Sequence, residues 1–329
     1  QARGNEEKDL SMNKIYQLII AVLTGSLLAF TASAQNALVT KELKLTSTEV
    51  LASSQATDWR LPEQRNLMYV QVSNTDAPVV FELAEDFAPK HIANLRTLVK
   101  QKYFDGLAII RSQDNYVAQW GDPAEDEGEF RTLGDAAETV EPEFYRAKKG
   151  LALQNIVSRD AYADEVGFVK GFAVGADAKG RNSAEARAWL THCYGALGVA
   201  RGMAMNSGNA SGLYAVTGHS PRHLDRNITL LGRALIGMEH LSTLPRGTES
   251  LGFYKTADEA TPIVSVRFGN ELPTEQQIHL EVMRTDTQIF RDYVAARTKR
   301  THDWFADPVS RIEVCNVNVP SRPVSTHSE

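Results

Sequence analysis

Residues 110–122 read IRSQDNYVAQWGD, and this stretch carries the most informative pattern in the chain. The apolar run at 107–110 predicts a short strand, and residues 117–123 predict a second strand that runs into a turn. Arg111, Tyr116 and Gln119 follow one another within it at fixed intervals. The stretch therefore predicts two short strands that carry a cation, an aromatic ring and an amide.

Segments before this stretch have clear periodic patterns. Residues 68–72 and 79–83 alternate as strands do, and the polar turn at 73–76 between them predicts a hairpin. Pro89 predicts the start of a helix, because its missing N–H costs little in the first turn. The helix is expected to place four apolar residues on one face and to end near the turn at 103–106. These four are Ile92, Leu95, Leu98 and Val99.

Segments after the stretch predict a mixture of short strands and helices. The expected strands cover residues 213–216, 228–231 and 263–268. The expected helices cover residues 183–190, 234–241 and a long amphipathic run at 274–298. Because strands and helices do not alternate regularly, the pattern favours an antiparallel barrel or an α+β arrangement over a doubly wound sheet.

The opening stretch and its surroundings resemble the signature of the cyclophilin family. That family has a helix with an Asn before an apolar residue, here Asn94-Leu95, and a Tyr/Phe-Asp-Gly turn, here at 103–106. Its catalytic Arg, aromatic and Gln keep the spacing of Arg111, Tyr116 and Gln119. A second block also matches the family. It comprises residues 198–201, 206–207, 224–225, Gly232 and 237–239.

The chain departs from the family pattern at several pocket positions. Ile110 stands where a His usually precedes the catalytic Arg, and His223 and Ile228 fall where a pocket Trp and a pocket His are usual. Gly212-Leu213-Tyr214 replaces Gln-Phe-Phe. Residues 123–197 form a longer insertion than usual. These changes alter the shape of the proline pocket more than the type of reaction.

The resemblance implies a mainly β fold with helices, in which a closed antiparallel β-barrel is capped by helices. It covers residues 67–270, with the insertion at about 123–197. An upstream segment and signal peptide at 1–34 and an N-terminal arm at 35–66 are expected before the barrel. A helical C-terminal extension and tail are expected at 271–329.

The resemblance also implies a peptidyl-prolyl cis–trans isomerase that needs no cofactor and no metal. Rotation about the X–Pro bond is slow because amide resonance sets a barrier of about 18–20 kcal/mol. Arg111 is the expected catalytic cation, and Gln119 is expected to orient it and to hold substrate backbone. The expected walls of the proline pocket are Tyr116, Val117, Met205, Leu213 and Tyr214, with His223 at the rim.

Each of these residues also has a structural interpretation. Arg111 alone would be a solvated surface charge, although the joint spacing argues against this. Tyr116 and Tyr214 are equally well ordinary core aromatics, and His223 is equally well a packed surface histidine. A second function is a cyclophilin-like module or chaperone that binds proline-containing segments with little turnover. In either case the expected partners are proline-containing polypeptide clients.

The N-terminal region has the layout of a secretory signal peptide. One basic residue, Lys14, follows Met12, which we expect to be the natural start, and an apolar run covers 19–30. The small residues at 32–34 predict cleavage after Ala34, and hence a periplasmic protein without stable membrane insertion. An uncleaved N-terminal anchor is the alternative, although the run is short for a membrane span.

Cys193 and Cys315 are the two cysteines of the 329-residue chain. Export favours a disulfide between them, and two buried free thiols are the alternative. A Cys193 nucleophile beside His192 is less favoured, because catalytic pairs meet in space rather than in sequence. Metal binding by His219 and His223 is disfavoured by Pro221 between them. A formal net charge of −6 argues against a nucleic-acid partner.

Overall fold

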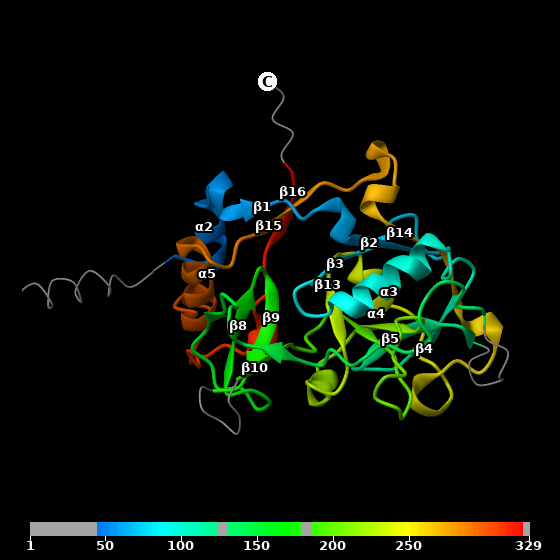
Figure 1. Cartoon of the computed structure of the whole chain (residues 1–329). Coiled ribbons are helices and arrows are strands. Elements are labelled where there is room, and N and C mark those ends of the chain that lie inside the picture. The colour runs from blue at the N-terminus through cyan, green and yellow to red at the C-terminus, as the bar shows by residue number, and fades with distance from the viewer. Residues whose placement is uncertain (1–44, 124–130, 179–185, 325–329) are drawn as a thin grey trace, which may run out of the picture. The chain divides into compact units, whose positions relative to one another are not determined.

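A closed antiparallel barrel of eight strands is the centre of the structure, in the order β11-β12-β5-β4-β14-β2-β3-β13 (Figure 1). The structure is a computed structural model that describes residues 45–123, 131–178 and 186–324. The strands are β2 (Leu67–Val72), β3 (Val79–Leu83), β4 (Ala108–Ser112), β5 (Val117–Gly121), β11 (Ala196–Val199), β12 (Leu213–Val216), β13 (Leu230–Ile236) and β14 (Thr261–Phe268). The expected mainly β barrel with helices, its first hairpin and the strands around Arg111 are confirmed.

Alternate residues of the barrel strands point to opposite sides, because side chains alternate along a strand. On β5, Ala118 and Trp120 belong to the buried core of the barrel, together with Leu213 and Ala215 of β12. Helix α3 (Pro89–Lys100) packs the apolar face predicted from its sequence against this same core. Burial of the barrel interior and of one face of α3 therefore forms one continuous core.

Glu143 caps the N-terminus of α3 from the insertion. Ala88 stands at the cap position and its side chain has no oxygen to accept a hydrogen bond. The backbone N–H groups of Lys90 and His91 instead each donate to the carboxylate of Glu143 at 3.0 Å. The His91 ring contacts the same carboxylate at 2.6 Å through Nδ1. The insertion thus satisfies helix N–H groups that the local sequence leaves without a partner.

The described insertion contains a five-stranded sheet, which we call the insertion sheet, in the order β6-β10-β9-β8-β7. Its strands are β6 (Arg146–Ala147), β7 (Gln154–Asn155), β8 (Glu165–Val169), β9 (Phe172–Ala176) and β10 (Arg187–Leu190). The helix expected at 183–190 is wrong where it is described, since β10 pairs with β9 and β6 on its two sides. Residues 183–185 lie outside the described residues. Pairing across the sheet overrides local helix propensity here.

The insertion sheet covers the outward face of part of the barrel. A second buried cluster, which we call the outer cluster, combines apolar residues of both layers. Its members are Ala84, Phe87, Val117, Val169, Phe172, Val174, Ala176, Ala188, Leu190, Ala196, Tyr214, Val216 and Leu230. Figure 1 shows β8, β9 and β10 beside the barrel strands. Outward residues that would face water in a bare barrel are therefore buried.

The segment after the barrel differs from the expected long helix at 274–298. It contains strand β15 (Leu280–Met283), which lies between β1 (Trp59–Arg60) and β16 (Ser321–Pro323) in a three-stranded sheet. Helix α5 (Gln288–Lys299) begins only after Thr287, whose hydroxyl accepts from the N–H of Phe290. The helix prediction was wrong because both partner strands of β15 are distant in sequence. The C-terminal extension is therefore mixed rather than helical.

The helix expected at 234–241 is also shorter than the pattern suggests. Strand β13 continues to Ile236, and Gly237 then adopts a left-handed φ of 85° that is easiest for glycine. Helix α4 covers Met238–Ser242. Pairing of β13 with β3 holds residues 234–236 in the sheet.

The short helix α2 (Ser47–Ala52) is capped by Thr46, whose side chain accepts from Glu49 N.

Cys193 and Cys315 form a disulfide across 122 residues of sequence. Cys193 follows β10, and Cys315 lies in a short 3-10 helix at Val314–Asn316. The disulfide therefore joins the C-terminal segment to the end of the insertion, next to the start of β11.

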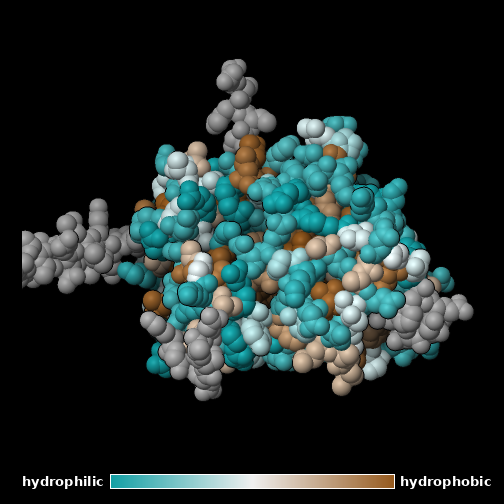
Figure 2. Space-filling view, viewed as in Figure 1, coloured by the Kyte–Doolittle hydropathy of each residue, from teal (hydrophilic) through white to brown (hydrophobic). Residues whose placement is uncertain are grey.

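Figure 2 shows a face on which hydrophilic residues predominate and hydrophobic residues occur in separate patches. Within the described ranges, none of the helices combines the length and the apolar character that a bilayer span requires. The expected signal peptide at 1–34 and most of the arm before residue 45 lie outside the described residues.

Loss of the disulfide is expected to destabilise the folded chain. For a loop of 122 residues the chain-entropy model gives about 4–5 kcal/mol. The Cys193→Ser/Cys315→Ser variant should lower the free energy of unfolding in urea by up to this amount. Reduced and alkylated wild type is the control and should behave like the variant. An unchanged urea midpoint in both samples would contradict the expectation.

Replacement of Glu143 by Gln is expected to weaken the cap of α3 by about 1 kcal/mol. Burial raises the pKa of Glu143, but hydrogen bonds from His91 and Lys90 outweigh it and hold this pKa below the ordinary value. The wild-type advantage should therefore be present above the ordinary glutamate pKa of 4.5 and be lost as the pH falls through the lower folded-state pKa. Urea unfolding from pH 7 to pH 3 measures this, and the exposed Glu141→Gln is the control. Equal stabilities at pH 7 would refute the role of the cap.

Candidate active site on the outer face of the barrel

Arg111, Gln119 and Tyr214 form a row across three neighbouring strands, which we call the cross-strand row. Arg111 on β4 is paired with Gln119 on β5, and Gln119 is paired with Tyr214 on β12. Residues directly opposite one another in an antiparallel pair point to the same side of the sheet. Leu213 and Ala118, their strand neighbours, belong to the barrel core, so the row lies on the outer face.

Arg111 is held by hydrogen bonds from three sides of its guanidinium. Nη1 donates to Oε1 of Gln119 at 3.1 Å, and Nη2 donates to Oε1 of Gln113. Nε donates to the backbone carbonyl of Leu251 at 2.7 Å. The Phe253 ring centroid lies 5.2 Å from the guanidinium carbon. The arginine is therefore fixed in a defined direction before any substrate arrives.

The segment that carries Leu251 and Phe253 adds a wall beside β4. Its backbone is bonded to that strand through Tyr254 N to Ile110 O and Gly247 N to Ser112 O, both at 3.0 Å. The side chain of Leu251 is exposed. Sequence reasoning missed this wall, because it lies 140 residues from Arg111 and no local pattern at 247–254 indicates the contact.

Tyr116 and His223 stack on the other side of Arg111. The guanidinium carbon lies 5.4 Å from the Tyr116 ring centroid, and the rings of Tyr116 and His223 are 5.9 Å apart at 26°. His223 Nδ1 lies 2.9 Å from the carbonyl of Ser220, so this nitrogen carries a proton and donates. Arg111, Tyr116 and Gln119 are thus brought together as their spacing predicted, and His223 joins them where the family resemblance placed it. All four are in part exposed to solvent.

The electrostatics of the site follow from partial burial. Burial lowers the pKa of Arg111, and the neighbouring Tyr116 opposes this change. Burial raises the pKa of Tyr116, and the Arg111 charge opposes that change. An arginine remains protonated in such surroundings, so the site presents a cation beside a neutral phenol at ordinary pH.

The remaining predicted pocket residues are placed differently from one another. Val117 and Tyr214 point outward but are buried in the outer cluster, with Tyr214 only 4% exposed. Leu213 is 0% exposed and faces the barrel interior, so its expected place in the pocket wall is wrong. Strand alternation is the physical reason, since its neighbour Tyr214 takes the outward direction. Met205 is 62% exposed in the loop after β11, and its role stays a prediction.

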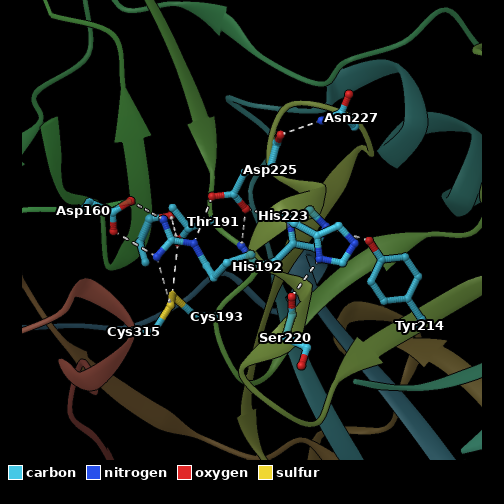
Figure 3. A network of polar contacts seen from close by, with 12 residues as sticks. Asp160, Thr191, His192, Cys193, Tyr214, Ser220, His223, Asp225, Asn227 and Cys315 are labelled. Carbon is cyan, nitrogen blue, oxygen red and sulfur yellow. Dashed lines mark hydrogen bonds and ion pairs between the residues drawn. A yellow bond between two sulfur atoms is a disulfide. The ribbon is translucent and has the colours of Figure 1, made fainter. Parts of the chain in front are cut away.

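Tyr214 leads into a buried polar network that the sequence did not indicate (Figure 3). Its hydroxyl lies 2.8 Å from Nε2 of His192, and Nδ1 of His192 lies 2.8 Å from Asp225. Cys193 is in the disulfide, so it is not available as a nucleophile in this state. The described residues contain no group of three or more His, Cys, Asp or Glu side chains arranged to hold a metal ion.

Comparison with known proteins assigns a family to the fold. The family model described as cyclophilin type peptidyl-prolyl cis-trans isomerase/CLD matches residues 67–267. The crystal structure of cyclophilin AquaCyp293 from Hirschia baltica is 25% identical, covers 85% of this chain and 98% of that chain, and superposes with a TM-score of 0.63. Because this match covers most of both chains, it includes the regions outside the barrel.

Curated relatives are named as peptidyl-prolyl cis-trans isomerases. A Brucella suis protein named as a peptidyl-prolyl cis-trans isomerase is 25% identical over 53% of this chain and 70% of its own length. A Synechocystis protein named as a thylakoid lumen peptidyl-prolyl cis-trans isomerase is 34% identical over 21% of this chain. That alignment spans only 18% of the Synechocystis protein. With a family model matched over more than half of its length and the eight-stranded barrel in place, the chain belongs to the cyclophilin-type peptidyl-prolyl cis–trans isomerase family.

Proposed function

We propose that the chain catalyses cis–trans isomerisation of X–Pro bonds in exported polypeptides, with Arg111 as the catalytic residue. The single observation that carries the proposal is the cross-strand row with Tyr116 and His223 beside it. It combines one fixed cation, one amide and three rings on the outer face of the barrel. This is the mixture of apolar surface and few directed polar groups that a peptide site requires.

Arg111 suits the reaction because the barrier arises from amide resonance. As the X–Pro bond twists, the prolyl nitrogen regains a lone pair that a donor can stabilise, and the carbonyl loses its partial charge. The guanidinium has five N–H donors, and the bonds to Leu251, Gln119 and Gln113 use one donor on each nitrogen. One N–H on Nη1 and one on Nη2 thus have no bond among these contacts and are directed by them. A donor oriented in advance favours the twisted amide over the planar one.

The proline ring would lie against Tyr116 and His223, above Gln119 on the outer face of the barrel. Gln119 has a carboxamide N–H₂ group in addition to the oxygen that accepts from Arg111. That group would donate to a substrate carbonyl next to the proline. The expected clients are unfolded or partly folded segments, because the peptide must reach the outer face of the barrel in an extended form.

A second function, binding of proline-containing segments with little turnover, is favoured by one observation. The Nε donor of Arg111 is already bonded to the Leu251 carbonyl, and Val117 and Tyr214 are nearly fully buried. A site of this kind would hold a peptide on its surface without enclosing the proline ring. Measurement of both turnover and binding with the same proline-containing peptide separates the two functions.

Replacement of Arg111 by Ala is expected to reduce kcat/KM on a short Ala-Pro peptide by about two to three orders of magnitude, as for the loss of a directed donor at other sites. Arg111→Lys should recover only part of the loss, because a lysine lacks the planar fork. A protease-coupled assay measures the rate. Arg291→Ala, an exposed arginine on α5, is the control and should keep wild-type activity. Pure, folded wild type without turnover would leave only the binding function, and equal rates for Arg111→Ala would exclude the arginine.

Export is the second part of the proposal. It is supported by the layout of residues 12–34, by the disulfide, and by the luminal name of the Synechocystis relative. Clients would then be proline-containing proteins of the periplasm, where disulfides persist.

Expression of the chain from Met12 in a Gram-negative host should give a periplasmic protein whose first residue is Gln35. Intact-mass measurement of the periplasmic fraction checks this. Ala34→Asp, which places a charge at the cleavage position, should leave the segment attached. A wild-type protein that keeps residues 12–34 and stays in the membrane fraction would instead establish the uncleaved anchor.

A further inference from the structure

The Tyr214 ring leans away from Gln119, over the neighbouring strand. Tyr214 lies on β12 between β5, which carries Gln119, and β11, which carries Gly198. A Cβ atom on Gly198 would lie 2.2 Å from Cζ and 2.3 Å from the hydroxyl oxygen of Tyr214. The far end of the phenol therefore occupies the space that a side chain at position 198 would fill. Glycine at this position allows the ring to lie over β11.

His192 holds the far end of the phenol in this place. Its Nε2 lies 2.8 Å from the Tyr214 hydroxyl, and the two rings are nearly parallel at 12° (Figure 3). Its Nδ1 lies 2.8 Å from Oδ1 of Asp225, which also accepts the backbone N–H of His192 at 2.9 Å. A carboxylate only accepts, so Nδ1 carries the proton and Nε2 accepts from Tyr214.

The surroundings keep the imidazole neutral and the phenol protonated. The His192 side chain is fully buried. Burial lowers the pKa of His192, while the hydrogen bond to Asp225 opposes this change. Burial also raises the pKa of Tyr214 well above its ordinary value. In both hydrogen bonds the donor therefore stays the same over the working pH range. His192 Nδ1 donates to Asp225, and the Tyr214 hydroxyl donates to His192 Nε2.

Asp225 is itself held by a rigid support. Nε of Arg222 donates to Oδ2 of Asp225 at 3.0 Å. The same guanidinium donates to Asp160 in the insertion and to Glu313 in the C-terminal segment, each at 2.7 Å at the shortest. Cys193, next to His192, ties that C-terminal segment to the insertion through the disulfide. Groups from three distant parts of the chain therefore fix the position of His192.

We propose that His192 is a positioning residue for the isomerase site, which holds the Tyr214 ring over Gly198 and so keeps the surface above Gln119 open for the proline ring. A released Tyr214 ring could rotate about its Cα–Cβ bond toward Gln119, its cross-strand neighbour. It would then occupy the place where the substrate lies. This inference rests on the proposed function, because it assumes that the cross-strand row receives the peptide.

A catalytic role for the Tyr214–His192–Asp225 arrangement itself does not fit the structure. Its order of contacts resembles an activated nucleophile with its base. However, the Tyr214 side chain is nearly fully buried and the His192 side chain is completely so. A substrate carbonyl cannot reach the Tyr214 hydroxyl. The network therefore acts on the site only by fixing the position of the Tyr214 ring.

Four variants test the inference, because they are expected to differ in KM and to leave kcat nearly unchanged. His192→Leu and Tyr214→Phe each remove the bond that holds the ring, and Gly198→Ala displaces the ring without changing His192. Each should raise KM for the Ala-Pro peptide about fivefold, the size expected for one net hydrogen bond, with kcat changed less than about twofold. His192→Gln keeps one donor and one acceptor and should restore most of the affinity.

His91→Leu is the matched control. His91 is also a buried histidine bonded to a carboxylate, that of Glu143, but it lies on α3 away from the cross-strand row. It should lower the melting temperature and leave KM unchanged. In a Tyr214→Ala background, Gly198→Ala should have no further effect on KM, because no ring remains to be displaced.

The outcomes separate this inference from the proposed function. Wild-type turnover that depends on Arg111, together with unchanged KM in His192→Leu, would overturn the role of His192 alone. If wild type binds the peptide without turnover, calorimetric Kd values replace KM, and the same fivefold change is expected. A wild type that neither turns over nor binds the peptide would overturn both proposals.

Discussion

The antiparallel register of β4, β5 and β12 places Arg111 opposite Gln119 and Gln119 opposite Tyr214. A shift of one residue in either pairing would turn the corresponding side chain into the barrel interior, because the side-chain period along a strand is two. The interior is already filled by Trp120, Ala118 and Leu213. Packing of the barrel core therefore fixes the register, and the register in turn assembles the site on the other face.

The insertion and the C-terminal segment act on the same face from outside. The insertion buries Val117 and Tyr214 in the outer cluster. The insertion supplies Asp160, and the C-terminal segment supplies Glu313, to Arg222. Several charges are buried there, and each is paired, as the cost of burying a charge demands. The extra segments thus shape the neighbourhood of the site while the barrel supplies its polar row.

Arg111 is rigidly held and yet partly exposed on the outer face of the barrel. Three donors hold it on Leu251, Gln119 and Gln113, while two aromatic rings flank it. A cation held in this way needs little reorganisation energy when an amide twists beside it. In the proposed function, the isomerisation chemistry belongs to this one residue, and the surface around it fits the proline ring.

The sequence alone predicted the barrel family through its resemblance, the first hairpin, α3 and the grouping of Arg111, Tyr116 and Gln119. These depend on local periodicity and on spacing within a few residues, which a single chain records directly. Only the tertiary structure shows that residues 187–190 and 280–283 are strands, that Leu213 faces inward, and that Leu251 contacts Arg111 while His192 contacts Tyr214. Each of these depends on partners many residues away, whose energetic contribution exceeds local propensity and leaves no mark in the local pattern.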